Sequence, residues 1–498
     1  MSLLGIDIGS GSCKGAAFGS DGRLLAKAEA GYAAQNELDP ESFRNAAAAV
    51  IRAVAAETAH DPVTALGIGS HGETFVAVDG AGRAVAPAVM NSDNRATAEA
   101  GWWERNFGAE RLYAVTGLPL HAMFSLNKIL WLRTHRPDVF AKSRKFLSAA
   151  DYVLSRFGMP QVTDFSLAGR SMAFDIRKRE WSDEILAAAG IGRDRFPEAV
   201  PAGTRIGTLP PDTAAELGLN PGVAVTVAGH DQPCGALGAG AVRPGIAAVS
   251  AGTYECAAAL SAEPANNATA FGFRLNSYCH VVPDSYVTLA FFPAGIAARW
   301  FAEQFCGGDR AEAERLGRPF LEYLDERTVA ACPGPSGICF TPHLVGSCNP
   351  DWDVRATGAI VGLTPEKTRH HLRKALYEGI ACELARNLAA LETVTGPVEE
   401  LRIGGGNAKA DFSVQLRADF AGKPFLVPRV TETVCLGAAL LAGVASGVYP
   451  DCGAAVGQAV RIGRRFLPDG AGRRAHAAQL ERYRQFYHSL APVREFAK

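Results

Sequence analysis

The sequence lacks an excess of charge of either sign. Its 498 residues include 50 lysines and arginines against 51 aspartates and glutamates, so the formal net charge is -1. Proteins bind nucleic acids and anionic membrane surfaces mainly through clustered positive charge, because both partners are densely negative. The composition therefore gives no electrostatic basis for a nucleic-acid or membrane partner.

Long apolar runs and paired cysteines are also missing. The apolar run 438–444 contains Gly443 and is far shorter than the roughly 20 residues that span a bilayer, so we expect it in the core. Residues 1–7 show neither a basic start nor a cleavage site, and no signal peptide is expected. The 11 cysteines are scattered from Cys13 to Cys452 without a Cys-x-x-Cys pair, which is typical of reduced thiols in a cytoplasmic protein.

The length of the chain is the first positive indication. A chain of 498 residues exceeds the roughly 250–300 residues at which a single hydrophobic core stops growing. Hydrophobic residues make up 48 % and charged residues 20 %, which are ordinary values for a globular protein. We therefore expect two large domains, residues 1–243 and 244–498, with the boundary marked by Pro244 and Gly245.

Short apolar runs alternate with helix-length segments along the chain. Strands are expected at residues 3–8, 15–18, 24–28, 63–70, 74–78, 224–228, 246–250, 254–260, 401–403 and 424–427. Helices are expected at residues 41–59, 125–133, 364–393, 410–420, 432–445 and 479–495. This alternation predicts an α/β protein.

A turn that joins glycine to a hydroxyl residue occurs twice between strand-like runs. Gly9-Ser10 stands between the first two runs, and Gly252-Thr253 stands between the runs 246–250 and 254–260. Aligning the two turns places strand on strand on both sides. This suggests two domains built on one plan, although the similarity is short.

The first of these turns has the composition of a phosphate-binding loop. In residues 7–14, glycines allow close approach of a ligand, and backbone N–H groups with hydroxyls can hold phosphate oxygens. Asp7, at the end of the strand, could hold Mg²⁺ through water. A plain β-turn with a capping Asp has the same composition, so this segment alone leaves both interpretations open.

The segment Gly229-His230-Asp231-Gln232 follows the apolar run 224–228. A carboxylate at the end of a strand, before small residues that start a helix, can project into a cleft and accept a proton from an attacking hydroxyl. Asp is also a favoured helix N-cap, and the local sequence does not decide between base and cap. His230 is more often structural than in contact with substrate.

Three consecutive glycines precede Asn407, between an expected strand and an expected helix. Bare backbone at Gly404, Gly405 and Gly406 would let a flat base or ribose pack closely, and a helix start favours anions. A plain loop is the alternative. Because three glycines in a row lose much backbone entropy on folding, we favour a ligand contact.

Together these segments resemble the FGGY family of carbohydrate kinases over nearly the whole chain. The matching segments are residues 7–10 with Lys14, 123–135, 340–344 with Gly346 and Pro350, 358–363 with Leu372 and 377–378, 404–406, Gln415, 418–419 and 436–439. Leu376 stands where the family pattern prefers a smaller or β-branched residue. The number and order of the segments, more than any one of them, carry the resemblance.

The resemblance implies two actin-like, ribonuclease H-like domains around a deep cleft, with ATP mainly on the second domain and sugar mainly on the first. It implies that Asp231 is the catalytic base, that Asp7 acts on Mg²⁺, and that Ser10 lies near the transferred phosphate. The residues expected to contact ATP are Gly9, Ser10, Ser12, Lys14, Gly252, Thr253, Gly405, Gly406 and Asn407. Domain closure would exclude water and limit wasteful hydrolysis of ATP.

The sugar side departs from the family patterns. Residues 71–74 stand where relatives present substrate-binding pairs, often Met-His in xylulose kinases or Arg-Glu in glycerol kinases; neither pair is intact, although Glu73 is similar to the glycerol kinase acid. Asn91 replaces a Trp that begins a family motif. Asp93 either contacts the sugar or pairs with Arg95 to orient the loop. The candidate substrate contacts are Gly72, Glu73, Thr74, Asp93, His230 and Gln232.

The sequence thus predicts an ATP-dependent kinase for a small-molecule sugar or polyol, with a ketopentose such as xylulose favoured. A glycerol- or erythritol-type polyol, a hexulose and a sugar acid are the alternative substrates. A non-catalytic actin-like ATP-binding sensor or regulator is the alternative function, and Asp231 distinguishes the two because a sensor needs no base. An ATP-driven chaperone would need a polypeptide-binding domain, for which no residues are left. A homodimer is compatible with the sequence, which does not define the oligomeric state.

Overall fold

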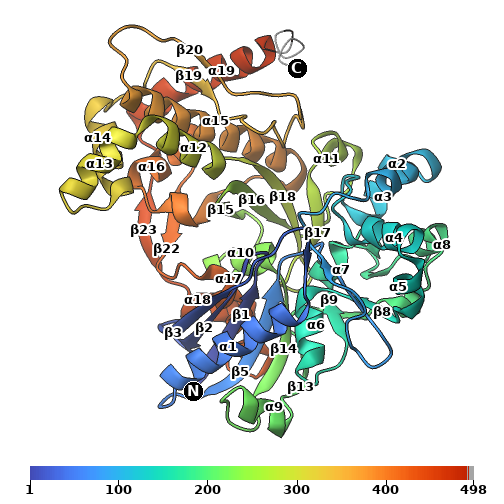
Figure 1. The fold of residues 1–498 in the computed structure, drawn as a ribbon. Coiled ribbons are helices and arrows are strands. Elements are labelled where there is room, and N and C mark those ends of the chain that lie inside the picture. Colours follow the sequence, from blue (N-terminus) through green and yellow to red (C-terminus); the bar gives the residue numbers. More distant parts are fainter. Residues whose placement is uncertain (491, 493–498) are drawn as a thin grey trace.

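Two mixed β-sheets organise the computed structural model, which describes residues 1–490 and 492 (Figure 1). The six-stranded sheet has the order β13 (Arg205–Thr208), β14 (Ala224–His230), β5 (Val63–Ser70), β1 (Ser2–Ile8), β2 (Ser12–Gly19) and β3 (Leu24–Gly31). The seven-stranded sheet has the order β17 (Asn276–Cys279), β18 (Tyr286–Pro293), β16 (Tyr254–Ser261), β15 (Ile246–Ala251), β21 (Glu400–Gly404), β22 (Phe425–Pro428) and β23 (Ile462–Phe466).

The two sheets share one plan. In the first, β1, β2 and β3 form an antiparallel meander, β5 and β14 add in parallel on the other side of β1, and β13 closes the edge antiparallel. In the second, β15, β16 and β18 form the meander, β21 and β22 add in parallel to β15, and β23 closes the edge antiparallel. Strand β17 is an extra edge strand on β18. The prediction of two domains on one plan is confirmed.

Helices cover the sheets and connect them. They are α1 (Glu41–Glu57), α2 (Thr97–Asn106), α3 (Ala109–Thr116), α4 (Ser125–His135), α5 (Pro137–Lys142), α6 (Ala149–Arg156), α7 (Phe165–Gly169), α8 (Asp183–Ala189), α9 (Pro211–Glu216), α10 (Asp231–Ala239), α11 (Ala268–Gly272), α12 (Gly295–Phe305), α13 (Gly307–Arg315), α14 (Phe320–Ala331), α15 (Arg369–Thr395), α16 (Asp411–Ala421), α17 (Thr433–Ala445), α18 (Cys452–Ala459) and α19 (Gly470–Ser489). Short strand pairs are β4 (Glu37–Leu38) with β7 (Ala88–Val89), β6 (Val76–Val78) with β8 (Lys145–Leu147), β9 (Val162–Asp164) with β12 (Glu198–Val200), β10 (Phe174–Asp175) with β11 (Glu180–Trp181), and β19 (Cys339–Thr341) with β20 (Ala359–Val361). Within the described residues, no helix is both long enough and apolar enough to cross a membrane.

Helices α10 and α17 cross between the two sheets at very close range (Figure 1). A Cβ atom at Gly238 would overlap the carbonyl oxygen of Thr433, and one at Gly437 would overlap that of Cys234. Helix α17 also lies directly under the first sheet, because a side chain at Gly5 would overlap the backbone of Cys435. Helix α17 of the second half therefore packs closely against the first half of the chain. The domain boundary at residues 243 and 244 stays a prediction.

Most expected elements are present, with shifts at their ends. The long helix predicted at 364–393 begins at Arg369, because Thr368 caps its first turn. The strand predicted at 74–78 is confined to Val76–Val78, since Glu73 has a left-handed backbone with φ of 63°. The helix predicted at 479–495 is observed as Gly470–Ser489, and residues 491 and 493–495 lie outside the described part of the chain.

Candidate active site

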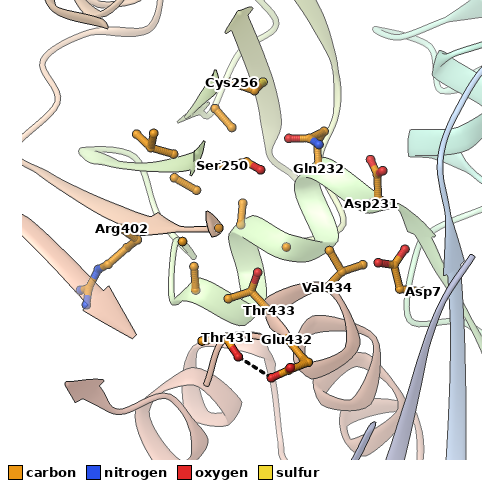
Figure 2. A pocket seen from close by; sticks show the side chains of 18 of the residues that line it. Asp7, Asp231, Gln232, Ser250, Cys256, Arg402, Thr431, Glu432, Thr433 and Val434 are labelled. Carbon is orange, nitrogen blue, oxygen red and sulfur yellow. Dashed lines mark hydrogen bonds between the residues drawn. The ribbon is translucent and has the colours of Figure 1, made fainter. Parts of the chain in front are cut away.

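A cavity of about 370 Å³ lies between the first turn of α10, the start of α17 and the ends of β15 and β21. It is lined by Asp7, Lys14, Asp231, Gln232, Gly235, Ala236, Ala239, Ala248, Val249, Ser250, Cys256, Ala258, Arg402, Gly404, Gly405, Gly406, Lys409, Thr431, Glu432, Thr433, Val434 and Cys435. Figure 2 shows Asp7 and Asp231 on one side of this cavity and Arg402 on the opposite side. Residues from both halves of the chain thus meet around one space.

The backbone at Gly229 sets the position of Asp231. Gly229 has φ of 99°, and a Cβ atom there would lie 2.6 Å from the Ser166 hydroxyl, so glycine is required. The next residue, His230, ends β14, and its N–H donates to that same hydroxyl at 2.8 Å. His230 holds the N-cap position of α10 and Asp231 is the first helical residue, and no side chain caps the helix. The structure therefore does not support the helix-cap alternative for Asp231.

The carboxylate of Asp231 is poorly stabilised as an anion. Its Oδ1 atom is buried and has no hydrogen-bond partner within the described part of the chain, although His230 Nε2 lies 3.1 Å away. Burial, followed by the negative charges of Asp7 and Glu73, raises the pKa of Asp231 to about 8. The side chain keeps 24 % of its surface exposed. A partly exposed carboxyl that readily takes up a proton has the properties of a general base.

Asp7 is a second carboxylate at the same cavity that is poorly stabilised as an anion. It is the penultimate residue of β1, opposite Lys14 on β2, and its Oδ1 atom is buried without a hydrogen bond from any described residue. Burial raises its pKa to about 6, while the nearby Lys14 lowers it. A bound cation would compensate this carboxylate. Across the described residues, no group of three or more His, Cys, Asp or Glu side chains could hold a metal ion by itself, so phosphate or water oxygens would have to complete such a site.

The turn between β1 and β2 presents backbone donors. The N–H groups of Ser10 and Gly11 have no hydrogen-bond partner among the described residues, whereas the Gly9 N–H donates to the Ser12 carbonyl at 2.9 Å. The Ser12 hydroxyl donates to Glu29 at 2.7 Å and is thereby directed away from a ligand. Free N–H groups at successive residues form a concave site for an anion.

The three glycines after β21 differ in what they touch. A Cβ atom at Gly405, where φ is 95°, would lie 2.8 Å from the carbonyl oxygen of Ala251, so glycine is needed there for packing. At Gly406 a Cβ atom would meet nothing within 4 Å. Asn407 donates to the Gly252 carbonyl at 3.5 Å, which ties this loop to the hairpin formed by β15 and β16. The absence of a side chain at Gly406 leaves open space beside bare backbone.

A second cavity, of about 760 Å³, adjoins the first at this loop, because Gly406 and Lys409 line both. Helices α12, α13, α14 and α15 form most of its other walls, with Arg299, Phe320 and Tyr377 among the lining side chains. Asn407 lines this second cavity. Of these three residues, Tyr377 stands in a segment that carries the family resemblance, whereas sequence patterns did not indicate Arg299 or Phe320.

The segment of the predicted sugar contacts is held by its own hydrogen bonds. His71 donates from Nδ1 to the Ile8 carbonyl at 2.8 Å and accepts the Thr74 hydroxyl at Nε2 at 2.7 Å. That hydroxyl also accepts the Asn91 N–H at 2.9 Å. The buried Glu73 accepts a hydrogen bond at Oε1 from Nε of Arg170 at 2.6 Å, and Nη2 of the same guanidinium lies 2.5 Å from this oxygen in an ion pair. Arg170 was not identified in the sequence, since nothing near it marks it as functional.

Asp93 is paired with Arg95, as one of the two sequence interpretations expected. Both carboxylate oxygens of Asp93 accept from Arg95, at 2.8 Å from the backbone N–H and at 2.9 and 2.7 Å from the guanidinium. The same guanidinium lies 4.7 Å from the ring of Trp131. This pair orients the loop, and a direct contact between Asp93 and a sugar stays a prediction.

The structure brings together only part of the predicted site. Six of the predicted residues line the first cavity: Asp7, Lys14, Asp231, Gln232, Gly405 and Gly406. The others do not line it: Gly9, Ser10, Ser12, Gly72, Glu73, Thr74, Asp93, His230, Gly252, Thr253 and Asn407. Arg402, Lys409, Thr431 and Thr433 line it without having been predicted.

Comparison with known proteins finds relatives over most of the chain. The model of the N-terminal domain of the FGGY family of carbohydrate kinases matches residues 2–238, and that of the C-terminal domain matches residues 247–446. The gluconokinase of Bacillus subtilis is 27 % identical over 89 % of this chain and 88 % of its own length. The glycerol kinase of Aromatoleum aromaticum is 30 % identical over 96 % of both chains. The crystal structure of a xylulose kinase from Lactobacillus acidophilus superposes with a TM-score of 0.89 over 100 % of both chains, at 22 % identity.

These matches confirm the predicted fold of two actin-like, ribonuclease H-like domains and the predicted enzyme class. Their substrates differ, so the comparisons do not identify the acceptor of this enzyme. Because family models cover both halves of the chain, this protein belongs to the FGGY family and is an ATP-dependent carbohydrate kinase.

Proposed function

We propose that this kinase transfers the γ-phosphate of ATP to a hydroxyl of an uncharged linear sugar or polyol, with a ketopentose such as xylulose favoured and Asp231 as the general base. The observation that carries the proposal is the carboxylate of Asp231, which borders the cavity with a buried, unpartnered Oδ1 and a pKa of about 8. In this proposal Asp231 takes the proton of the acceptor hydroxyl while that oxygen attacks phosphorus and ADP leaves.

The two adjoining cavities suggest how ATP would lie. We place adenosine in the larger cavity beside Gly406 and Asn407, where bare backbone and aromatic side chains offer a surface for a flat base. The phosphates would then pass Gly405 and the hairpin at Gly252 and Thr253 into the smaller cavity. There Lys14 is available to the terminal phosphates. The free N–H groups of Ser10 and Gly11, in the turn that precedes the strand of Lys14, would bind phosphate oxygens next to this cavity.

Asp7 fits a role in holding Mg²⁺ through water. Its buried Oδ1 has no hydrogen bond from the described residues, and it borders the same cavity as Lys14 and Asp231. The cation supplies neutralisation of the β- and γ-phosphate oxygens when it is bound. Asp7 would contribute one carboxylate, which is in keeping with the few protein ligands that Mg²⁺ takes beside substrate phosphates.

Charge favours an uncharged acceptor over a sugar acid. Asp7, Asp231 and Glu73 lie near enough for their charges to act on one another, and Arg170 is already paired with Glu73. A substrate carboxylate would add a further negative charge beside Asp231, where Arg170 is paired with Glu73 and Lys128 donates to the Met90 carbonyl. A sugar hydroxyl can instead donate to the Oε2 atom of Glu73, which has no hydrogen-bond partner among the described residues. In this proposal Gly72, His230 and Gln232 form the rest of the sugar wall.

Replacement of Asp231 by Asn tests the base. We expect sugar-dependent ADP formation to fall by about 10²- to 10⁴-fold, the usual contribution of a general base, while ATP binding is retained. A variant that forms ADP at a near wild-type rate would show that Asp231 is not the base. An ATP-binding sensor predicts instead that the wild-type protein binds ATP and forms no ADP with any sugar.

A coupled ADP-release screen tests the acceptor class. It compares xylulose and other ketopentoses, hexuloses, erythritol, glycerol and gluconate at equal concentration. We expect a ketopentose to give the highest kcat/KM and gluconate to give little ADP. Preference for gluconate over every uncharged acceptor would contradict the charge argument while leaving the kinase assignment intact.

A further inference from the structure

Strand β17, at the edge of the second sheet, reaches the sugar side of the site. It lies beside α7 of the first half of the chain (Figure 1). Two of its side chains form hydrogen bonds with His230 and Arg170, which lie near the proposed base. The Tyr278 hydroxyl lies 2.7 Å from Nδ1 of His230, and Oδ1 of Asn276 accepts from Nη1 of Arg170 at 3.2 Å.

These four side chains are buried between the two domains. Their exposed fractions are 0 % for Tyr278, 4 % for Asn276, 5 % for His230 and 6 % for Arg170. Buried polar groups need partners, because burial removes the hydrogen bonds of water. Water therefore cannot readily replace the hydrogen bonds that Asn276 and Tyr278 make.

Asn276 completes the set of acceptors around Arg170. Nε of the guanidinium donates to Oε1 of Glu73, Nη2 forms an ion pair with the same oxygen, and Nη1 donates to Asn276. The guanidinium lies between two rings, 5.3 Å from the centre of Phe124 and 4.9 Å from that of Tyr278. With its plane and its hydrogen bonds both defined, Arg170 keeps Glu73 in one orientation and leaves Oε2 of that carboxylate for a substrate hydroxyl.

Tyr278 acts on the other side, through His230. Burial, followed by the charge of Arg170, lowers the pKa of His230 well below its ordinary value, so the ring is neutral and has one donor and one acceptor nitrogen. When the tyrosine hydroxyl donates to Nδ1, the proton of the ring resides on Nε2. Nε2 lies 3.1 Å from Oδ1 of Asp231. In that arrangement Tyr278 selects the tautomer whose protonated nitrogen lies nearer to the proposed base.

We propose that Asn276 and Tyr278 are positioning residues of the sugar site, which act through Arg170 on Glu73 and through His230 on Asp231. The proposal rests on the proposed function, in which Asp231 is the base and Glu73 contacts the acceptor. In this proposal, two side chains of the second sheet, which carries the proposed ATP site, hold residues of the sugar site in position. Sugar recognition then depends on how the two domains are packed, in addition to the residues that touch the sugar.

The test measures kcat and the separate KM values for sugar and ATP. Asn276→Leu removes the acceptor for Arg170, and we expect the sugar KM to rise about tenfold with the ATP KM unchanged. Asn276→Asp keeps an acceptor oxygen and should restore most of the sugar affinity. Tyr278→Phe keeps the ring on Arg170 and removes only the hydroxyl, and we expect kcat to fall about tenfold with the ATP KM unchanged.

Tyr113→Phe is the matched control. The Tyr113 hydroxyl donates to the carbonyl of Leu275, the residue before β17, at 2.8 Å. Its loss therefore weakens a contact between α3 and the start of β17 and leaves the bonds to His230 and Arg170 in place. We expect its kinetic constants to equal those of the wild type. If Tyr278→Phe and Asn276→Leu behave like this control, the inference is wrong.

Different variants test the proposed function and this inference. Retention of activity by Asp231→Asn would overturn the base assignment, whatever the β17 variants do. An inactive Asp231→Asn together with unchanged β17 variants would leave the base in place and refute only the positioning role. Loss of folded protein, seen as a lower melting temperature without a change in either KM, also counts against positioning.

Discussion

The raised pKa of Asp231 makes a prediction about stability that is independent of any substrate. Replacing Asp231 by Asn keeps the size of the side chain and removes its charge. The folded pKa of about 8 lies above the ordinary value of 3.8, so the folded wild-type protein binds this proton more tightly than the unfolded chain does. This carboxyl must then lower the stability of the wild type as the pH rises between these two values, and the Asn variant must lack this contribution.

The size of the effect follows from the same shift. Each pH unit between the two pKa values corresponds to about 1.4 kcal/mol at most, so the variant should gain about 4 kcal/mol relative to the wild type between about pH 5 and pH 8. Unfolding entropy of about 2 cal/mol/K per residue gives about 1 kcal/mol/K for a chain of this length. The difference in melting temperature should therefore widen by about 4 °C over this range.

The assay is thermal unfolding of both proteins, without nucleotide, in buffers from about pH 5 to pH 8. Other buried carboxyls, such as Asp7 and Asp151, titrate in both proteins, so the difference between the two melting temperatures is the informative quantity. Glu263→Gln is the control, because that side chain is 84 % exposed and its ion-pair distance to Arg177 is 3.7 Å. A melting-temperature difference for Asp231→Asn that stays constant with pH, like that of the control, would refute the burial argument.

Two further predictions concern the nucleotide side. Chelation of Mg²⁺ should abolish phosphoryl transfer, and Asp7→Asn should raise the Mg²⁺ concentration needed for half-maximal activity; full activity in chelator would exclude the role proposed for Asp7. Gly406→Ala should leave the melting temperature unchanged and raise the ATP KM, because open space surrounds Gly406. Gly405→Ala should instead destabilise the protein, because φ is 95° and the backbone of Ala251 lies 2.8 Å from the added carbon. Equal effects of the two substitutions on stability and on ATP KM would contradict this distinction.

Local patterns determined much of the fold. The strands predicted at 3–8 and 63–70 are observed as Ser2–Ile8 and Val63–Ser70, and the helix predicted at 432–445 is observed as Thr433–Ala445. These elements depend on apolar periodicity and on glycine or proline at their ends, which short stretches of sequence contain. The alignment of Gly9-Ser10 with Gly252-Thr253 also predicted the repeated topology, because each turn joins the first two strands of a meander.

The candidate site was predictable only where a motif carries the chemistry within a few residues. Asp231 and the glycines at 404–406 could be identified in this way, since a strand end followed by small residues is visible locally. The partner of Glu73 could not, because Arg170 is 97 residues away in the chain and nothing in either segment indicates the other. The walls of the larger cavity come largely from four helices that meet only in the folded protein.

The sequence by itself thus determined the two-domain α/β fold, the repeated plan and the residue that we propose as the base. The tertiary structure decided which polar groups are free and which are occupied: the Thr74 hydroxyl holds its own loop, whereas Oδ1 of Asp231 is left without a partner among the described residues. It also placed α17 of the second half under the first sheet, and β17 against the sugar side. The physical reason is that burial and hydrogen bonding between distant segments depend on packing, which local propensity does not encode.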